Sequence, residues 1–352
     1  MAVRVNSVQV FMSLTGRRSY SVCILLLLWS LLASNLTAQE EQAPTFRSES
    51  NLVVVPALVR NSRGNIVYGL QASDFVIQDD GVPQLVRVDE QAEAEPVSVV
   101  VAIQVGRRAN FEFPRIRGLN AMLAPLLSEG RSQVAVLFVD SRVHPVGDFT
   151  TDPDLLARDL KQVSPGDGGA AMLDAVNQSV QLLNTAPRYR QRVVLLIGET
   201  RDHGSQAKAE DVVRSLGDSN VVVYALSFSP AKSNVLDTLR GNNNPDLHPE
   251  QTEVHEGPDL LAPILLVTQA MHSNSAKAVA AMSGGEYERF DSAKQFDLRM
   301  NDFANHLHNR YVLSFQPKDP HPGLHQLQVQ LKEPTGATVL ARTSYWAKGN
   351  QP

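Results

Sequence analysis

Short apolar runs alternate with helical segments through the middle of the chain. The runs are rich in β-branched residues and almost free of charge, and they cover residues 97–104, 133–140, 192–198 and 220–228. Strands of this kind are typical of a parallel sheet that is covered on both faces. Between them the apolar positions follow helical spacing, as in Leu173, Val176, Val180 and Leu183. This rhythm predicts an α/β fold with a doubly wound, mostly parallel sheet.

The pattern also places the smaller elements of this domain. A short edge strand is expected over residues 142–150, and Asp152 and Pro153 are a good N-cap and first-turn pair for the helix that follows. Residues 230–258 have no periodicity and contain Gly, Asn and Pro, so we expect an insertion loop there. The alternation then resumes and predicts a helix over 259–283, a strand over 286–290 and a helix over 292–309.

Both ends of the chain outside this block carry strands without helices. Apolar and polar positions predict N-terminal strands over 52–59, 66–68, 74–78 and 84–88, with turns at 61–65 and 79–83, and C-terminal strands over 310–315, 325–331 and 337–346. Two sheets packed on each other are more stable than isolated strands. We therefore expect a discontinuous β-sandwich made of residues 47–95 and 310–348, with an acidic linker at 89–96 and the α/β domain at 96–309.

The first 38 residues have the layout of a signal peptide. Arg4, Arg17 and Arg18 precede an apolar run at 23–33, and the small residue Ala38 precedes a polar stretch. The apolar run is shorter than the roughly 20 residues of a membrane-spanning helix. We expect cleavage after Ala38 and a secreted or periplasmic protein; the alternative is an uncleaved N-terminal anchor.

Charge and cysteine content narrow the classes of partner. Without the leader the chain has 29 basic and 37 acidic residues, a net charge of −8, which disfavours nucleic acid. The one cysteine, Cys23, lies in the leader. The mature chain would therefore have no disulfide, thiol nucleophile or cysteine metal site, which suits a protein of the bacterial envelope.

Three segments of the α/β block carry a resemblance to a known domain. They are the strand at 97–104 with its loop, residues 168–176 and residues 193–200. Their order and spacing resemble those of a von Willebrand factor A domain. With the flanks Leu70–Val88 and Arg342–Ala347, the chain over residues 47–348 is similar to the VWFA-related domain family described chiefly from acidobacterial genomes.

The resemblance implies a divalent ion at the carboxyl end of the first strand. Such domains hold it with an Asp-x-Ser-x-Ser loop, a Thr from a second loop and an Asp after the fourth strand, all of them hard oxygen ligands. On this sequence the five positions fall on Gln104, Gly106, Arg108, Ala170 and Gly198. None supplies a carboxylate or a hydroxyl, and a shift of the first loop by one residue restores none. We therefore expect a degenerate adhesion site without a metal ion, and no cofactor.

Two sets of residues at the same edge of the sheet could act in place of the ion. Arg107 and Arg108 could bind an acidic group of a partner directly; the simpler interpretation is a pair of solvated loop arginines. Glu199, Asp202 and His203 could form an offset site; capping and turn roles also explain acidic residues that follow a strand.

No other motif indicates catalysis. The chain has neither a Gly-x-Ser-x-Gly nucleophile elbow nor a phosphate-binding Gly-x-x-x-x-Gly-Lys loop. Most of the histidine pairs lack the spacing of a helical metal pair, and His321 and His325 lie in a Pro-rich turn. We expect none of these histidines to bind metal.

These observations lead to two hypotheses of different classes. The first is an exported, non-enzymatic adhesion or scaffolding protein that binds another protein or an envelope polymer, with membrane contact only through an uncleaved leader. The alternative is a metal-dependent, hydrolase-type enzyme with the offset site around Glu199, Asp202 and His203. The sequence indicates neither the identity of the partner nor the oligomeric state.

Overall fold

The computed structural model describes residues 52–347, except for 90–95, 108, 129, 188–189, 229–261, 320 and 334–335. Several expected features fall outside these residues, namely the leader at 1–38, the insertion loop at 230–258, most of the linker at 89–96, and Arg108.

A six-stranded sheet forms the centre of the α/β domain, in the order β10-β9-β8-β5-β6-β7. The strands are β5 (Val97–Gln104), β6 (Gln133–Val139), β7 (Val143–Pro145), β8 (Gln191–Gly198), β9 (Val221–Phe228) and β10 (Tyr287–Phe290). Neighbouring strands pair in parallel except for β6 and β7. Every residue of β5 and of β9 is buried, as expected for strands with helices on both sides. The predicted fold class is confirmed.

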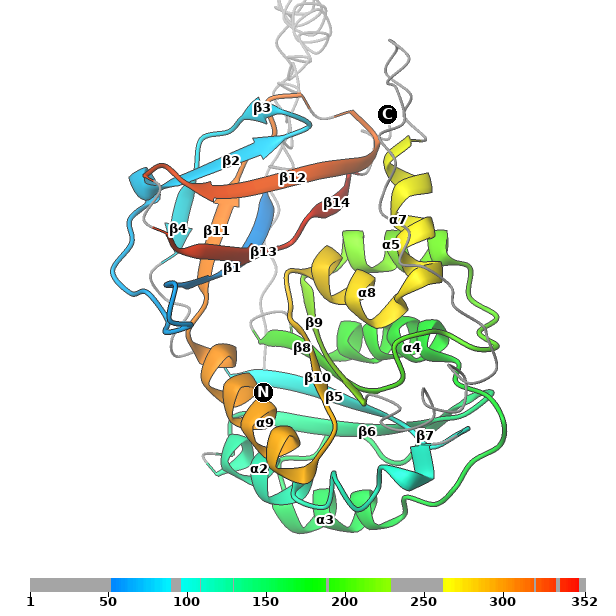
Figure 1. The fold of residues 1–352 in the computed structure, drawn as a ribbon. Helices are drawn as coiled ribbons and strands as arrows, with labels where there is room; N and C mark the ends of the chain where they lie inside the picture. Colours follow the sequence, from blue (N-terminus) through cyan, green and yellow to red (C-terminus); the bar gives the residue numbers. More distant parts are fainter. Residues whose placement is uncertain are drawn as a thin grey trace, which may run out of the picture. The chain divides into compact units, whose positions relative to one another are not determined.

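Helices cover both faces of this sheet (Figure 1). One layer consists of α4 (Met172–Thr185), α5 (Ala209–Asp218), α7 (Ala262–Ser273) and α8 (Ser275–Ser283), and it shares a core with Val100 and Ala102 of β5. The other consists of α2 (Leu119–Leu127), α3 (Pro153–Lys161) and α9 (Ala293–His308), which share a core with Val99 and Val101. The part of the chain that the structure describes also contains the short 3₁₀ helices η2 (Ala72–Asp74) and η4 (Ala109–Phe111). Among the described helices, none combines the length and the apolarity needed to cross a membrane.

Two local expectations in the α/β domain are confirmed only in part. The single helix expected over 259–283 is divided at Asn274, whose backbone leaves the helical region (φ −152°) and whose side chain accepts the N–H of Lys277 at 2.9 Å. An Asn N-cap starts a new helix there instead of continuing the old one. The edge strand expected over 142–150 is limited to β7 and a single bridge between Val134 and Thr150.

The strands at the two chain ends form two four-stranded antiparallel sheets, β13-β1-β11-β4 and β14-β12-β2-β3. They are β1 (Val53–Arg60), β2 (Phe75–Asp79), β3 (Val82–Pro83), β4 (Arg87–Asp89), β11 (Tyr311–Phe315), β12 (Gly323–Leu331), β13 (Thr338–Ala341) and β14 (Ser344–Ala347). Each sheet contains strands from both ends. Side chains of both sheets share one core, among them Val55 and Leu313 from the first and Ile77 and Leu327 from the second. The discontinuous β-sandwich is therefore confirmed.

The turns and strand ends of the sandwich differ in detail from expectation. The turn at 79–83 is confirmed, because Asp80 (φ 47°) and Gly81 (φ 81°) are both left-handed, as a two-residue hairpin turn requires. The strand expected at 84–88 is confirmed only in part, because Arg87 and Val88 belong to β4. The chain passes between the two sheets at this point, since β3 pairs with β2 whereas β4 pairs with β11. The strand-type pairing of residues 66–68 is limited to the bridge from Ile66 to Arg60. The strand expected over 337–346 is divided into β13 and β14.

A buried carboxylate joins the sandwich to the α/β domain. Glu286 precedes β10, is 8% exposed, and lies 3.0 Å from Nδ1 of His306 in α9. Arg310, just before β11, and Arg60, in β1, each place a guanidinium nitrogen 3.4 Å from its carboxylate. Burial alone would raise the pKa of Glu286, but the His306 hydrogen bond and the positive neighbours lower it below its ordinary value of 4.5. The ionised carboxylate thus stabilises this joint.

The substitution Glu286→Gln should destabilise the protein by about 3–5 kcal/mol at pH 7, because it leaves buried cations without their counter-charge. Denaturant unfolding measures this. Glu288→Gln is the matched control, since Glu288 pairs with Arg299 at 3.2 Å where both side chains are about a third exposed. A group with a lowered folded-state pKa loses its contribution as pH falls, so the difference from wild type should narrow below pH 4.5. Equal effects of the two substitutions would contradict this account.

Candidate functional site at the carboxyl edge of the sheet

Three loops meet where the parallel strands end. They are residues 104–107 after β5, residues 165–171 before α4, and residues 198–203 after β8. Gln104 links the first to the third: its Oε1 accepts the N–H of Glu199 at 2.6 Å and its Nε2 donates to the carbonyl of Gly106 at 3.3 Å. Gln104 is 1% exposed, so both polar ends of its amide are satisfied inside the protein.

Main-chain atoms of neighbouring segments pack against Gly106 in the first loop. A Cβ at Gly106 would overlap the carbonyl oxygen of Gly169 and would lie 2.9 Å from both Cα and Cβ of Asp140. Gly198 is also confined, since a Cβ there would overlap Cε of Met172 and lie 2.9 Å from Oε1 of Gln104. Main-chain atoms cannot move aside as a methionine tip can, so a side chain is excluded more strongly at Gly106 than at Gly198.

Ala170 is held by main-chain pairing with the loop after β8. Its N–H donates to the carbonyl of His203 at 2.9 Å, and its carbonyl accepts the N–H of His203 at 2.8 Å. Ala170 is fully buried. Of the five expected ligand positions, Arg108 lies outside the described residues. Among the other four, Gln104 alone carries a side-chain oxygen, and that oxygen accepts the N–H of Glu199.

The structure brings two of the expected binding residues together as an ion pair. Arg107 has a left-handed backbone (φ 56°), and its N–H donates to the carbonyl of Asp167 at 2.7 Å. Its Nε lies 3.1 and 3.3 Å from the two carboxylate oxygens of Glu199. The Arg107 side chain is 37% exposed and that of Glu199 is 18% exposed. Nε2 of His203 lies 3.8 Å from Oε2 of the same carboxylate.

Asp202 has a different role from its neighbours. Its carboxylate accepts the N–H of Leu173, in the first turn of α4, at 3.0 Å, and the hydroxyl of Ser205 at 2.5 Å. Its own N–H donates to Oγ of Ser275 at 2.9 Å. Asp202 therefore caps α4 from outside that helix. The offset site expected from Glu199, Asp202 and His203 is reduced to the contact between Glu199 and His203.

A pair of aspartates at this edge was not recognised in the sequence. Oδ1 of Asp140, directly after β6, lies 2.8 Å from Nε2 of His144. Oδ1 of Asp167 accepts the N–H groups of Ser141 and Gly169, both at 2.8 Å. The Ser141 hydrogen bond lowers the pKa of Asp167; burial alone would raise that of Asp140, but the bond to His144 lowers it. The available signal was an Asp-Ser pair immediately after a buried strand.

No family model and no curated protein matches the chain. Similar solved structures include von Willebrand factor type A from Catenulispora acidiphila, at 10% identity and a TM-score of 0.40, covering 85% of this chain and 75% of that one. BatB from Bacteroides thetaiotaomicron is 16% identical with a TM-score of 0.37, covering 59% and 99%. Proximal thread matrix protein 1 from the mussel byssus, with a zinc occupied MIDAS motif, is 12% identical with a TM-score of 0.44, covering 66% of this chain and 50% of that one.

These neighbours are proteins with von Willebrand factor A domains, and all three TM-scores lie below 0.5. The class of the fold rests on the strand order and the two helical layers. It is an α/β domain with a doubly wound, mostly parallel sheet, beside a β-sandwich made of N- and C-terminal strands.

Gly106→Ala should destabilise the protein by about 1–3 kcal/mol, because the added methyl group has to displace main-chain atoms of the 165–171 loop. Gly168→Ala is the control, since a Cβ there meets nothing within 4 Å. Thermal or denaturant unfolding of both variants measures the difference. If Gly106→Ala is as stable as Gly168→Ala, the loop is not packed as described.

Proposed function

We propose that this protein is an exported, non-enzymatic adhesion or scaffolding module of the VWFA-related family, and that it binds another protein or an envelope polymer without a divalent ion. The observation that supports this most strongly is the packing at Gly106. The carbonyl of Gly169 occupies the space that a serine side chain at this position would need. The edge is thus filled by protein atoms at one of the positions where such domains place a ligand.

The chemistry of the remaining positions does not fit a hard cation. Mg²⁺ and Ca²⁺ take carboxylate, hydroxyl, carbonyl and water oxygens. Ala170 and Gly198 have no side-chain oxygen, and that of Gln104 already accepts a main-chain N–H. Arg107 brings positive charge to the same loop, and this charge would repel a metal ion.

Arg107 and Phe111 are the anchors that this edge offers to a partner. The Phe111 side chain belongs to η4, shortly after Arg107, and is 72% exposed. Arginine and aromatic residues are enriched among the residues that carry binding energy at interfaces. Glu199 holds Nε of Arg107, and the Nη groups of that guanidinium make no hydrogen bond within the described residues. A carboxylate of the partner would bind there.

The competing proposal is a metal-dependent hydrolase. The observation in its favour is the approach of His203 Nε2 to Glu199 Oε2, at 3.8 Å. A metal centre needs at least a third ligand, and the carboxylate of Asp202 is bound to α4 and Ser205 instead. We therefore favour binding over catalysis.

Addition of Mg²⁺ or Mn²⁺ to protein first treated with EDTA should leave the melting temperature unchanged, because an ion that binds only the folded state would raise it. Differential scanning calorimetry measures this. If either ion stabilises the wild type and Glu199→Gln abolishes that stabilisation, the result would refute the proposal and support the hydrolase.

Arg107→Glu should abolish capture of the partner from an envelope extract, because it reverses the charge that meets the partner's acidic group. Arg63→Glu is the matched control: it makes the same charge change at an exposed turn of the sandwich. Quantitative affinity capture with both variants measures the effect. Retention of the same partner at the wild-type level by Arg107→Glu would exclude binding through this edge.

A further inference from the structure

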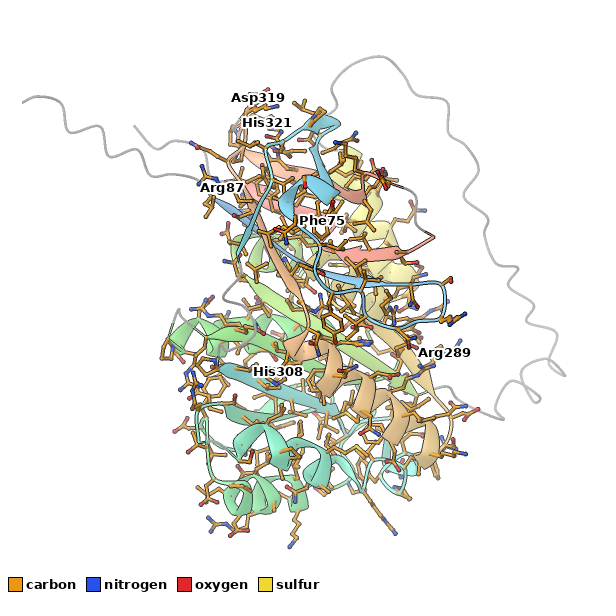
Figure 2. The ribbon with its side chains drawn as sticks, turned by 90° about the vertical axis from the view of Figure 1, so that its left-hand side faces the viewer. Phe75, Arg87, Arg289, His308, Asp319 and His321 are labelled. Carbon is orange, nitrogen blue, oxygen red and sulfur yellow. The ribbon has the colours of Figure 1, made fainter. Side chains whose placement is uncertain are left out.

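Two histidines and an aspartate converge at one end of the β-sandwich. Asp80 lies in the turn after β2, and its Oδ1 accepts the N–H of Gln326 in the paired strand β12 at 2.9 Å. This contact sets Asp80 beside His325 of β12. His321 precedes β12 and lies near Asp319 at the outer end of the sandwich (Figure 2). Asp80, His321 and His325 each offer a ligand atom, and the three atoms lie within 4.8 Å of one another.

Hydrogen bonding fixes the direction in which His325 presents its ring. Its Nε2 lies 2.7 Å from the backbone carbonyl of His321, which can only accept, so Nε2 carries a proton. Its Nδ1 faces two carboxylates, 3.0 Å from Oδ1 of Asp79 and 3.0 Å from Oδ2 of Asp80. His325 is 1% exposed, so water does not separate these groups.

A lone pair on Nδ1 would be repelled by two carboxylate oxygens in this buried setting. A proton or a metal ion between Nδ1 and these oxygens would remove this repulsion. A histidine whose other ring nitrogen donates to a backbone carbonyl has the orientation that is usual for metal-bound imidazole.

We propose that Asp80, His321 and His325 bind a Zn²⁺ ion, through Oδ2, Nε2 and Nδ1 respectively. Oδ2 of Asp80 lies 3.3 Å from Nε2 of His321 and 3.0 Å from Nδ1 of His325. Ligands at the usual 2.0–2.1 Å from a tetrahedral Zn²⁺ are about 3.3 Å apart, so these separations need little adjustment. Imidazole nitrogen combined with carboxylate oxygen suits Zn²⁺ better than Mg²⁺ or Ca²⁺.

His321 has to tilt for its lone pair to reach the ion. Its ring stacks on that of His325 with a centroid distance of 4.0 Å and an interplanar angle of 17°, and lone pairs in nearly parallel ring planes do not meet at one point. The side chain is 35% exposed, and its Nδ1 has no hydrogen-bond partner within the described residues. The tilt therefore breaks only the ring stacking and the contact with Asp80, which the ion would replace.

The rest of the environment divides into a buried side and an exposed side. Asp79 is 4% exposed, and its Oδ2 accepts the hydroxyl of Tyr345 at 2.8 Å. Its Oδ1 lies 3.0 Å from Nδ1 of His325, so this carboxylate adds negative charge on the buried side of the ion. Asp80 and His321 are about a third exposed. The fourth position of the ion would thus face solvent, open to water or to a side chain of a partner, as in zinc sites with three protein ligands. The site belongs to the sandwich and does not depend on the function proposed for the sheet edge.

Isothermal titration of the full-length, EDTA-treated protein with ZnCl₂ tests the site. The wild type should bind one Zn²⁺ ion through these residues, and His321→Ala should weaken that binding at least tenfold. Asp80→Asn should weaken it as well, while Asn still tolerates the left-handed backbone. His308→Ala, at the half-buried last residue of α9 in the other domain, is the control and should bind as the wild type does (Figure 2).

Substitution with Co²⁺ gives a second readout, because a tetrahedral site produces visible absorption bands that His321→Ala should remove and His308→Ala should keep. Absence of saturable Zn²⁺ binding by the wild type would overturn the proposal, and a proton on Nδ1 of His325 would then remove the repulsion. Equal Zn²⁺ affinities of His321→Ala and His308→Ala would also overturn it.

Discussion

The ionised carboxylate of Glu286 is the interaction on which the arrangement of this molecule depends. It is buried between two structural units and is surrounded by His306 of α9, Arg310 before β11, and Arg60 of β1. A buried charge is tolerated only when it is paired and hydrogen-bonded, so the carboxylate and its cations have to be brought together when the chain folds. Glu286 thereby connects a sandwich made of the two chain ends to the α/β domain inserted between them.

A second buried charge supports the same joint in a different way. Arg342, between β13 and β14, donates to the carbonyls of Leu216 and Gly217 in the last turn of α5, and to those of Val54 and Ser344. Burial lowers its pKa to about 10, which leaves it charged at neutral pH. The C-terminal end of a helix carries partial negative charge, so α5 stabilises a guanidinium that has only carbonyl partners among these contacts.

The parts of the fold that could be predicted are those governed by local patterns. Strand β5 was predicted at its observed bounds, because a strand buried on both faces has to be apolar throughout. The break at Asn274 and the passage from β3 to β4 depend on a cap and on strand partners, which no periodicity reveals. The convergence of Asp80, His321 and His325 follows from the pairing of β2 with β12, so a view limited to the Pro-rich turn could not detect it.

At the sheet edge, too, the local sequence pattern could not reveal how segments that are distant in the chain pack together. The sequence showed that ligand-type side chains are missing at Gln104, Ala170 and Gly198, but simple loss of ligands would leave space at the edge. The contact between Gly106 and the carbonyl of Gly169 shows instead that backbone fills part of this space, and the hydrogen bonds of Asp167 to Ser141 and Gly169 hold that backbone in position. Binding to a surface that is already ordered loses less conformational entropy than binding that must first order a loop. A packed edge with Arg107 held by Glu199 therefore supports the proposal that a partner is recognised directly rather than through an exchangeable ion.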